Sequence, residues 1–192
     1  MKHKVGIIGF QFANNYGALL QLYAQKMFIE AQGFEVDIIN VKKTSRSKWL
    51  KWGFDFVFFF NFFYFRFFHL RCYLPAVHMR DYDPKSLEKY NVLIIGTDQL
   101  WRHDIVGDAA QLYFLQDVTG VRKMANSVSV GRLTEQTASF LLTHKDNLQD
   151  FEKITVREPG VLGLMPETFN TACVASDPVF LFSEIPEKGK KE

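Results

Sequence analysis

The chain opens with an apolar, β-branched run, Val5–Phe10, that ends in the polar corner Asn14–Gly17. Apolar residues then recur every three or four positions over Leu20–Ala31, which predicts a helix. We expect this helix to run over about 16–32, with Asn15 as its N-cap and Gly33 as its stop. A buried strand that turns sharply into a helix is typical of the first unit of a doubly wound α/β domain.

The same alternation of strand and helix patterns continues along the chain. Further strands are predicted at Glu35–Val41, Val92–Gly96, Met124–Val130, Ile154–Val156 and Ala172–Ala175, a short helix starts at Asp83-Pro84, and a longer one covers Thr134–Leu148. This order predicts an α/β fold with a Rossmann-like, mostly parallel sheet and helices on both faces. Ligands of such folds bind beyond the carboxyl ends of the strands, so the polar loops there are the first candidates for function.

An aromatic segment, Phe54–Phe68, interrupts this pattern and holds most of the excess of phenylalanine. Polar residues such as Asp55 and Arg66 make it a poor membrane span. We favour a helical insertion over about 54–74 that packs inside the protein. Two alternatives stay open, which are a helix lying in a membrane interface beside the basic flank Lys42–Lys51, and a contact for self-association.

Composition narrows the class of protein. The formal charge of +2 predicts no nucleic-acid partner, and Cys72 and Cys173 are too few for a disulfide scaffold or a zinc site, which fits the cytoplasm. The membrane-interface alternative would place the protein on the inner face of the membrane. We expect one domain over 1–183, and a charged, disordered tail over 184–192.

Polar clusters follow the predicted strands. They are Asn14-Asn15-Tyr16-Gly17, Thr97-Asp98-Gln99-Leu100-Trp101, Arg157-Glu158 and Asp177-Pro178. In a parallel sheet the first three share the carboxyl edge, which favours a binding cleft there. Singly, each cluster also fits a cap, a turn or a surface ion pair. The sequence contains no dinucleotide-binding glycine pattern, no P-loop and no histidine–cysteine metal cluster.

The order of four motifs is more specific than any one of them. The stretch from Phe10 to Gln21 (F-Q-F-A-N-N-Y-G-A-L-L-Q), the block V-L-I-I-G-T-D-Q-L-W, T-V-R-E and S-D-P-V-F-L together resemble the polysaccharide pyruvyl transferase family over about Lys4–Phe182. The resemblance implies the N-terminal Rossmann-like half of a two-domain, glycosyltransferase-B-like enzyme. It also implies transfer of a pyruvyl group from phosphoenolpyruvate to a saccharide or lipid-linked saccharide, forming a ketal in cell-surface polysaccharide synthesis.

The resemblance assigns expected roles to the matched loops. Asp98 would orient or deprotonate an acceptor hydroxyl, and Arg157 would hold an anion through its planar fork. Trp101 would stack on a sugar ring. The other expected substrate-binding residues are Asn14, Asn15, Tyr16, Gly17, Thr97, Gln99 and Glu158. Phosphoenolpyruvate would be the donor substrate, with no cofactor and no metal.

The resemblance also places donor-binding basic residues and a catalytic histidine in a second half, which follows the half that this chain resembles. We therefore expect this chain to be truncated, and to be inactive alone or completed by a second polypeptide. Two other classes of function stay open. One is a glycosyltransferase-type module that uses a nucleotide sugar, and the other is a non-enzymatic remnant that binds a partner.

Overall fold

A computed structural model of the chain describes residues 3–10, 15–41, 76–79, 81–164 and 172–184. Its centre is a seven-stranded sheet with the order β3-β2-β1-β4-β5-β6-β7, in which every pairing is parallel. The strands are β1 (Lys4–Ile8), β2 (Glu35–Val41), β3 (Ala76–Met79), β4 (Val92–Asp98), β5 (Arg122–Val128), β6 (Phe151–Val156) and β7 (Cys173–Val174). The expected Rossmann-like α/β fold is confirmed.

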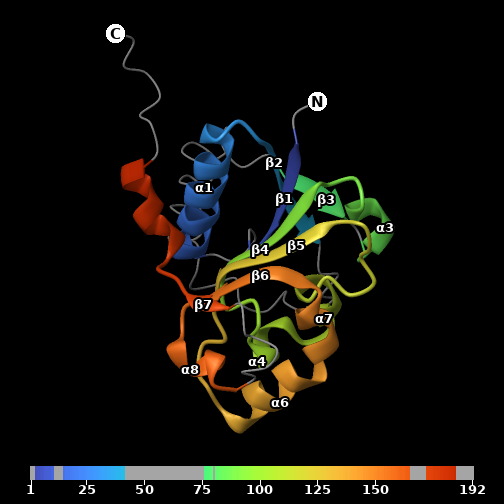
Figure 1. Ribbon diagram of the computed structural model, residues 1–192, viewed down its shortest axis with the longest axis vertical. Coiled ribbons are helices and arrows are strands. Elements are labelled where there is room, and N and C mark those ends of the chain that lie inside the picture. Colours follow the sequence, from blue (N-terminus) through green and yellow to red (C-terminus); the bar gives the residue numbers. More distant parts are fainter. Residues whose placement is uncertain (1–2, 11–14, 42–75, 80, 165–171, 185–192) are drawn as a thin grey trace, which may run out of the picture.

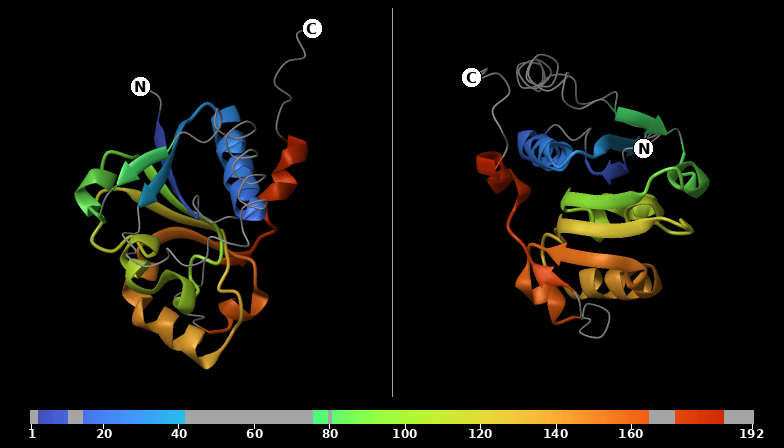
Figure 2. Two further views of the ribbon diagram at one scale, coloured as in Figure 1. Left: turned by 180° about the vertical axis from the view of Figure 1, so that it is seen from behind. Right: turned by 45° about the horizontal axis from the view of Figure 1, so that its top comes forward.

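The helices lie on both faces of this sheet, as Figure 1 shows. They are α1 (Tyr16–Ala31), α3 (Pro84–Leu87), α4 (His103–Val106), α5 (Ala110–Tyr113), α6 (Glu135–Thr143), α7 (Lys145–Gln149) and α8 (Pro159–Leu162), with 3₁₀ turns η2 (Gly107–Ala109) and η3 (Pro178–Glu184). Helix α1 packs on one face together with η3, and α4, α6 and α7 lie on the other. The right-hand view of Figure 2 shows β1, β4, β5 and β6 side by side in that order.

Local signals explain why the elements begin where they do. Asn15 caps α1, since its side-chain oxygen accepts hydrogen bonds from the backbone N–H groups of Gly17 and Ala18. Asp83 caps α3 in the same way, with Pro84 at the first helical position. The central strands β1 and β4 are apolar because helices cover both of their faces.

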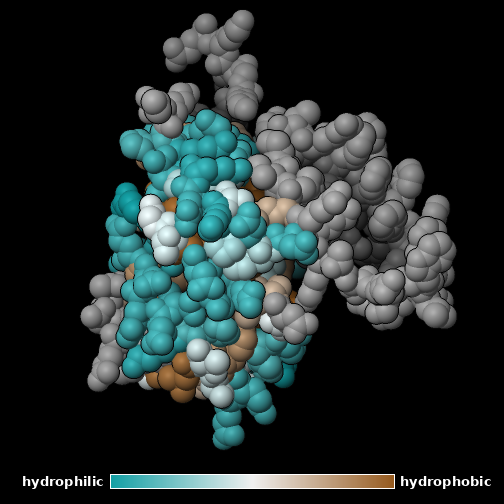
Figure 3. Space-filling model, turned by 90° about the vertical axis from the view of Figure 1, so that its right-hand side faces the viewer, coloured by the Kyte–Doolittle hydropathy of each residue, from teal (hydrophilic) through white to brown (hydrophobic). Residues whose placement is uncertain are grey.

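Two apolar cores stabilise the domain. The smaller one joins α1 to the sheet through Ile7, Leu22, Ile38 and Ile94, among other residues. The larger one fills the opposite face and includes Leu93, Leu141 and Trp101. On the side of the molecule seen in Figure 3, the described surface is mostly hydrophilic.

The strand order fixes where a ligand would enter. From β1 the chain moves outward to β2, whereas from β4 it moves the other way to β5. The two connections diverge at the carboxyl ends of β1 and β4, which is the place where open α/β sheets bind their ligands. The turn at residues 97–98 therefore lies at the expected place for a site.

Several boundaries differ from the sequence prediction. Strand β4 continues past Gly96 to Asp98, and β5 begins at Arg122 rather than Met124. The helix expected over 134–148 is divided at His144 into α6 and α7. Strand β3 was not predicted at all, and Glu184 belongs to η3 rather than to a disordered tail.

The aromatic segment 54–68, its basic flank and the tail 185–192 lie outside the described residues. The predictions of burial, membrane contact or self-association therefore stay predictions. None of the described helices is long and apolar enough to cross a bilayer.

Candidate functional site

The loops chosen from the sequence follow β1, β4 and β6, which run parallel. They therefore lie along one edge of the sheet, formed by the carboxyl ends of the strands. The loop after β7, which carries Asp177, reaches the same edge through its contact with Arg157. Asn14 lies outside the described residues.

Arg157 is the centre of an ionic cluster at this edge. Its Nη1 donates to Asp177 Oδ2 at 2.9 Å, and its Nη2 lies 3.8 Å from Asp98 Oδ1. The same Asp177 oxygen accepts a hydrogen bond from Gln21 Nε2 of α1. The cluster therefore connects α1 and the ends of β4 and β6 with the loop after β7.

The Asp98 carboxylate is held less tightly than that of Asp177. At 3.8 Å its contact with Arg157 is an ion pair but is too long for a hydrogen bond. Within the part of the chain that the structure describes, its side-chain oxygens accept no hydrogen bond, while the side chain is 18% exposed. Asp98 thus keeps acceptor capacity that a ligand could use.

The backbone bends sharply at this carboxylate. Thr97 and Asp98 have φ values of 37° and 79°, in the left-handed region that β-branched residues avoid. The carbonyl of Asp98 accepts hydrogen bonds from the N–H groups of Leu100 and Ser129, which fixes the turn. Such strained positions are concentrated at functional sites.

The structure corrects the roles expected for Thr97 and Trp101. The Trp101 ring is fully buried, is stacked on Phe114 at 5.7 Å, and donates its Nε1–H to the carbonyl of Tyr113. Thr97 is 1% exposed and its hydroxyl oxygen is buried. Neither side chain offers a surface to a substrate. The expectation that Trp101 stacks on a sugar is therefore wrong, because this apolar side chain completes the larger core.

Glu158 holds the loop after β5 in place. Its carboxylate accepts hydrogen bonds from the Ser129 hydroxyl and the Val130 N–H, and Ser129 Oγ in turn accepts one from the N–H of Gly131. The carboxylate is therefore used within the protein. We assign Glu158 to the support of the site.

Gln99 contributes to the candidate site by holding the side chain of Arg102, a residue that the sequence prediction missed. Gln99 Oε1 accepts a hydrogen bond from Arg102 Nη1 at 2.7 Å. Arg102 also forms a two-pronged pair with Asp104, at 2.6 and 2.7 Å, which lowers the pKa of that carboxyl. A second arginine thus lies at this edge, four positions after Asp98.

The start of α1 contributes a cap and an exposed ring. Asn15 Oδ1 is occupied by the capping hydrogen bonds, and Gly17 leaves room for it, since a Cβ there would lie 3.2 Å from that oxygen. Tyr16 is 37% exposed. The substrate-binding roles expected of Asn15, Tyr16 and Gly17 remain predictions.

Sequence reasoning missed Gln21 and Arg102 and left Asp177 without a role. Gln21 is 7% exposed, so a polar side chain lies on the buried face of α1. A glutamine on the apolar side of an amphipathic helix was the signal that could have found it. Arg102 carried no such signal, because an arginine after a turn is ordinary on a protein surface.

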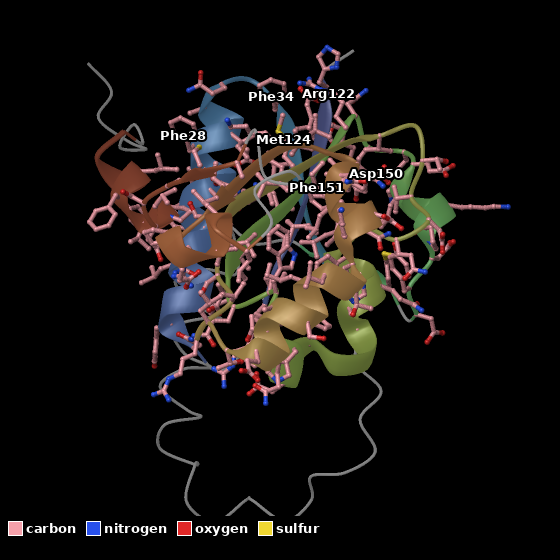
Figure 4. All side chains as sticks on the ribbon, turned by 60° about the horizontal axis from the view of Figure 1, so that its bottom comes forward. Phe28, Phe34, Arg122, Met124, Asp150 and Phe151 are labelled. Carbon is pink, nitrogen blue, oxygen red and sulfur yellow. The ribbon has the colours of Figure 1, made fainter. Side chains whose placement is uncertain are left out.

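A separate hollow lies at the opposite edge of the sheet. It has a volume of about 650 Å³, and Phe34, Tyr90, Asn91 and Arg122 are among its lining residues. Figure 4 shows Phe34 and Arg122 in the same upper part of the molecule. Arg122 is paired with Glu152 and the Tyr90 hydroxyl with Asp37. We place the candidate site at the carboxyl edge instead, because open α/β sheets bind their ligands there. Among the described residues, no group of three His, Cys, Asp or Glu side chains is arranged to hold a metal ion.

One of the comparisons with known proteins identifies the family of this chain. A search of curated proteins found no match. The family model described as polysaccharide pyruvyl transferase matches residues 15–192, which is most of the chain and includes Asp98, Arg102 and Arg157. The chain therefore belongs to the polysaccharide pyruvyl transferase family.

Proposed function

We propose that this chain binds the saccharide acceptor of a pyruvyl transfer reaction between Asp98 and Arg157, with phosphoenolpyruvate as the donor. Family membership supports the class of reaction. The observation that carries the assignment of residues is the gap of 3.8 Å between Arg157 Nη2 and Asp98 Oδ1.

A hydroxyl group has the right chemistry to bridge these two atoms from the side, because 3.8 Å leaves no room for an atom directly between them. Its oxygen can accept a hydrogen bond from the guanidinium while its proton is donated to the carboxylate. Asp177 occupies Arg157 Nη1 and so leaves Nη2 directed toward Asp98. Asp98 and Arg157 would then orient one acceptor hydroxyl, and Asp98 would take its proton as general base.

The charges of the cluster also favour a neutral ligand at this point. The carboxylates of Asp98 and Asp177 both face Arg157, so the positive charge of the guanidinium is already outnumbered. A bare phosphate placed there would meet two like charges, so we do not keep the anion-holding role that the resemblance gives to Arg157. A saccharide hydroxyl meets no such repulsion.

The reaction then balances as follows. The methylene carbon of phosphoenolpyruvate takes up a proton and becomes a methyl group, and the carbon that carries the phosphate becomes electrophilic. One saccharide hydroxyl adds to that carbon, the bond to the phosphate oxygen breaks with its electron pair, and a second hydroxyl of the same saccharide closes the ketal. Inorganic phosphate leaves. The two protons that the saccharide hydroxyls release balance the proton taken up by the methylene carbon and the one that leaves with the phosphate. Asp98 accepts a proton from an attacking hydroxyl, and Arg157 holds that oxygen in place.

Saccharide binding tests the proposal directly. We would record saturation-transfer NMR spectra of the chain with a panel of p-nitrophenyl hexosides, and would repeat them with Asp98→Asn and with Glu152→Gln. Glu152 is a matched control because it is an exposed carboxylate paired with an arginine at the opposite edge. We expect Asp98→Asn to abolish the saccharide signal and Glu152→Gln to preserve it. An unchanged signal in Asp98→Asn would refute the assignment.

A product assay tests the reaction itself. The chain is incubated with phosphoenolpyruvate and the hexosides that bind, and mass spectrometry looks for a gain of one pyruvate less one water. We expect no product from the chain alone, because the resemblance places donor-binding residues in a second half, and clear product formation would overturn that expectation. Binding of a nucleotide sugar through its nucleotide, without hexoside binding, would instead favour the glycosyltransferase-type alternative.

A further inference from the structure

Arg102 presents its charge at the carboxyl edge in a way that Arg157 does not. The Arg102 side chain is 38% exposed, and its Nε and a terminal nitrogen point at the two oxygens of Asp104, which is itself 49% exposed. By contrast, Arg157 lies between two partly buried carboxylates, and its Nε is buried. Arg102 is thus the more accessible of these two cations.

The guanidinium of Arg102 is supported from behind. Gln99 Oε1 accepts from Nη1, which leaves Nε and Nη2 as the two parallel donors that face Asp104. The stem of Arg102 lies against Gly131, where an added Cβ would come within 3.0 Å of Arg102 Cδ. The orientation of the fork is therefore set by residues other than Asp104.

Asp104 is a partner that a ligand can replace. An ion pair between exposed side chains contributes little to stability, because water screens it. A carboxylate or a phosphate offers the same two-oxygen face to a guanidinium as Asp104 does. We infer that Arg102 is an anion-binding residue of this edge, which takes the carboxylate or phosphate of phosphoenolpyruvate in place of Asp104. The identity of this ligand rests on the proposed function, and the assignment departs from the expectation that the donor-binding basic residues lie in a second half.

A second arginine gives a matched control. Arg122 pairs with Glu152 through Nε and Nη2 at 2.7 and 2.6 Å, and both side chains are exposed to a similar extent, 59% and 49%. The pair lies at the amino edge, where Arg122 lines the hollow beside Phe34 (Figure 4). It reproduces the geometry of the Arg102–Asp104 pair away from the candidate site.

The experiment is a set of calorimetric titrations of the chain with phosphoenolpyruvate, without saccharide. Arg102→Gln should weaken binding roughly tenfold or more, since a two-pronged charged contact is lost. Asp104→Asn should strengthen it by roughly two- to fivefold, because the competing carboxylate is gone. Arg122→Gln and Glu152→Gln should leave it unchanged. A gain of affinity in Asp104→Asn cannot result from misfolding. Thermal melting shows whether Arg102→Gln is folded, so that a loss of affinity in this variant can be interpreted.

Separate titrations with pyruvate and with inorganic phosphate identify which end of the donor Arg102 holds. Arg102-dependent binding of either one supports the inference. It is overturned if the wild type binds none of the three anions, if Arg102→Gln binds phosphoenolpyruvate like the wild type, or if Arg122→Gln loses as much affinity. Failure of the proposed function is distinguishable, because that appears as the absence of saccharide binding at Asp98 while these titrations are unaffected.

Discussion

Asp177 Oδ2 lies 2.9 Å from Arg157 Nη1, and this contact holds the loop after β7 against the end of β6. The other oxygen of Asp177 accepts the N–H of Val179, at the start of η3. One carboxylate therefore joins the last described segment of the chain to the arginine at the centre of the candidate site. Asp177 positions Arg157, and through it the gap in front of Asp98.

We predict that Asp177→Asn lowers the free energy of unfolding by about 1–3 kcal/mol, because charged hydrogen bonds to a partly buried arginine are lost. The matched variant is Asp98→Asn. The ion pair of Asp98 is long and carries no hydrogen bond, so this variant should cost less than about 1 kcal/mol. Urea unfolding of both variants checks the difference, and equal losses would show that the two carboxylates have equivalent structural roles.

Trp101 should behave as a core residue. Its ring is fully buried and stacked on Phe114, so Trp101→Ala should destabilise the protein by about 3–5 kcal/mol. Trp101→Phe retains an aromatic ring but loses the hydrogen bond to the Tyr113 carbonyl, and should cost about 1–3 kcal/mol. Thermal melting measures both. If Trp101→Ala melted at the wild-type temperature but bound saccharide more weakly, Trp101 would be a substrate-binding residue and not a core residue.

The sequence was sufficient to predict the sheet and the edge, since these depend on local signals. Apolar runs predict the strands, Asn15 and Asp83 predict caps, and alternation predicts parallel pairing. Polar residues after β4 and β6 then had to lie at one edge. The sequence therefore predicts that Asp98 and Arg157 lie together, and in the structure Arg157 Nη2 is 3.8 Å from Asp98 Oδ1.

The directions of the side chains that follow Asp98 could not be predicted from the sequence, because they depend on the backbone turn at the end of β4. The positive φ values at Thr97 and Asp98 change which way the following residues point. As a result Trp101 enters the core while Arg102 lies at the surface. The sequence instead indicates a role in substrate binding for Trp101 and none for Arg102. Hydrogen bonds between residues far apart in the sequence, such as that of Gln21 with Asp177, could not be predicted either, because no local pattern indicates them.

Gly131 tests whether the position of Arg102 matters. Gly131 has φ of 73°, and an added Cβ would lie 3.0 Å from Arg102 Cδ and 3.3 Å from Gln99 Cδ. We predict that Gly131→Ala costs about 1–2 kcal/mol for its left-handed backbone and also displaces the guanidinium, which weakens phosphoenolpyruvate binding. Calorimetry and urea unfolding measure the two effects separately.

The control for Gly131 is Gly120, whose φ is 70° and whose Cβ would meet nothing within 4 Å. Gly120→Ala should show the same backbone cost of about 1–2 kcal/mol with no change in anion affinity. If both variants bind phosphoenolpyruvate equally well, the contact between Gly131 and Arg102 has no role in binding.

His144 should make the stability of the domain depend on pH. Its ring is stacked on Phe114 with centroids 4.0 Å apart and meets Phe140 edge-on at 4.9 Å. Burial lowers the pKa of His144, and a hydrogen bond with Asn147 opposes this in part. The folded state thus favours the neutral imidazole, which fits an aromatic environment better than the cation.

The sign of the effect follows from the proton balance. In the unfolded chain the pKa of histidine returns to about 6.5, so below that pH the unfolded state binds more protons than the folded state. The contribution of His144 to stability is complete above about pH 6.5 and decreases as the pH falls toward the lowered pKa of the folded state. We predict a decrease in the free energy of unfolding between about pH 7.5 and pH 5.5 that is smaller in His144→Gln. His3→Gln is the control, since it removes an exposed histidine outside this aromatic cluster. Urea unfolding at both pH values provides the measurement, and an identical decrease in the wild type and in His144→Gln would mean that another group causes it.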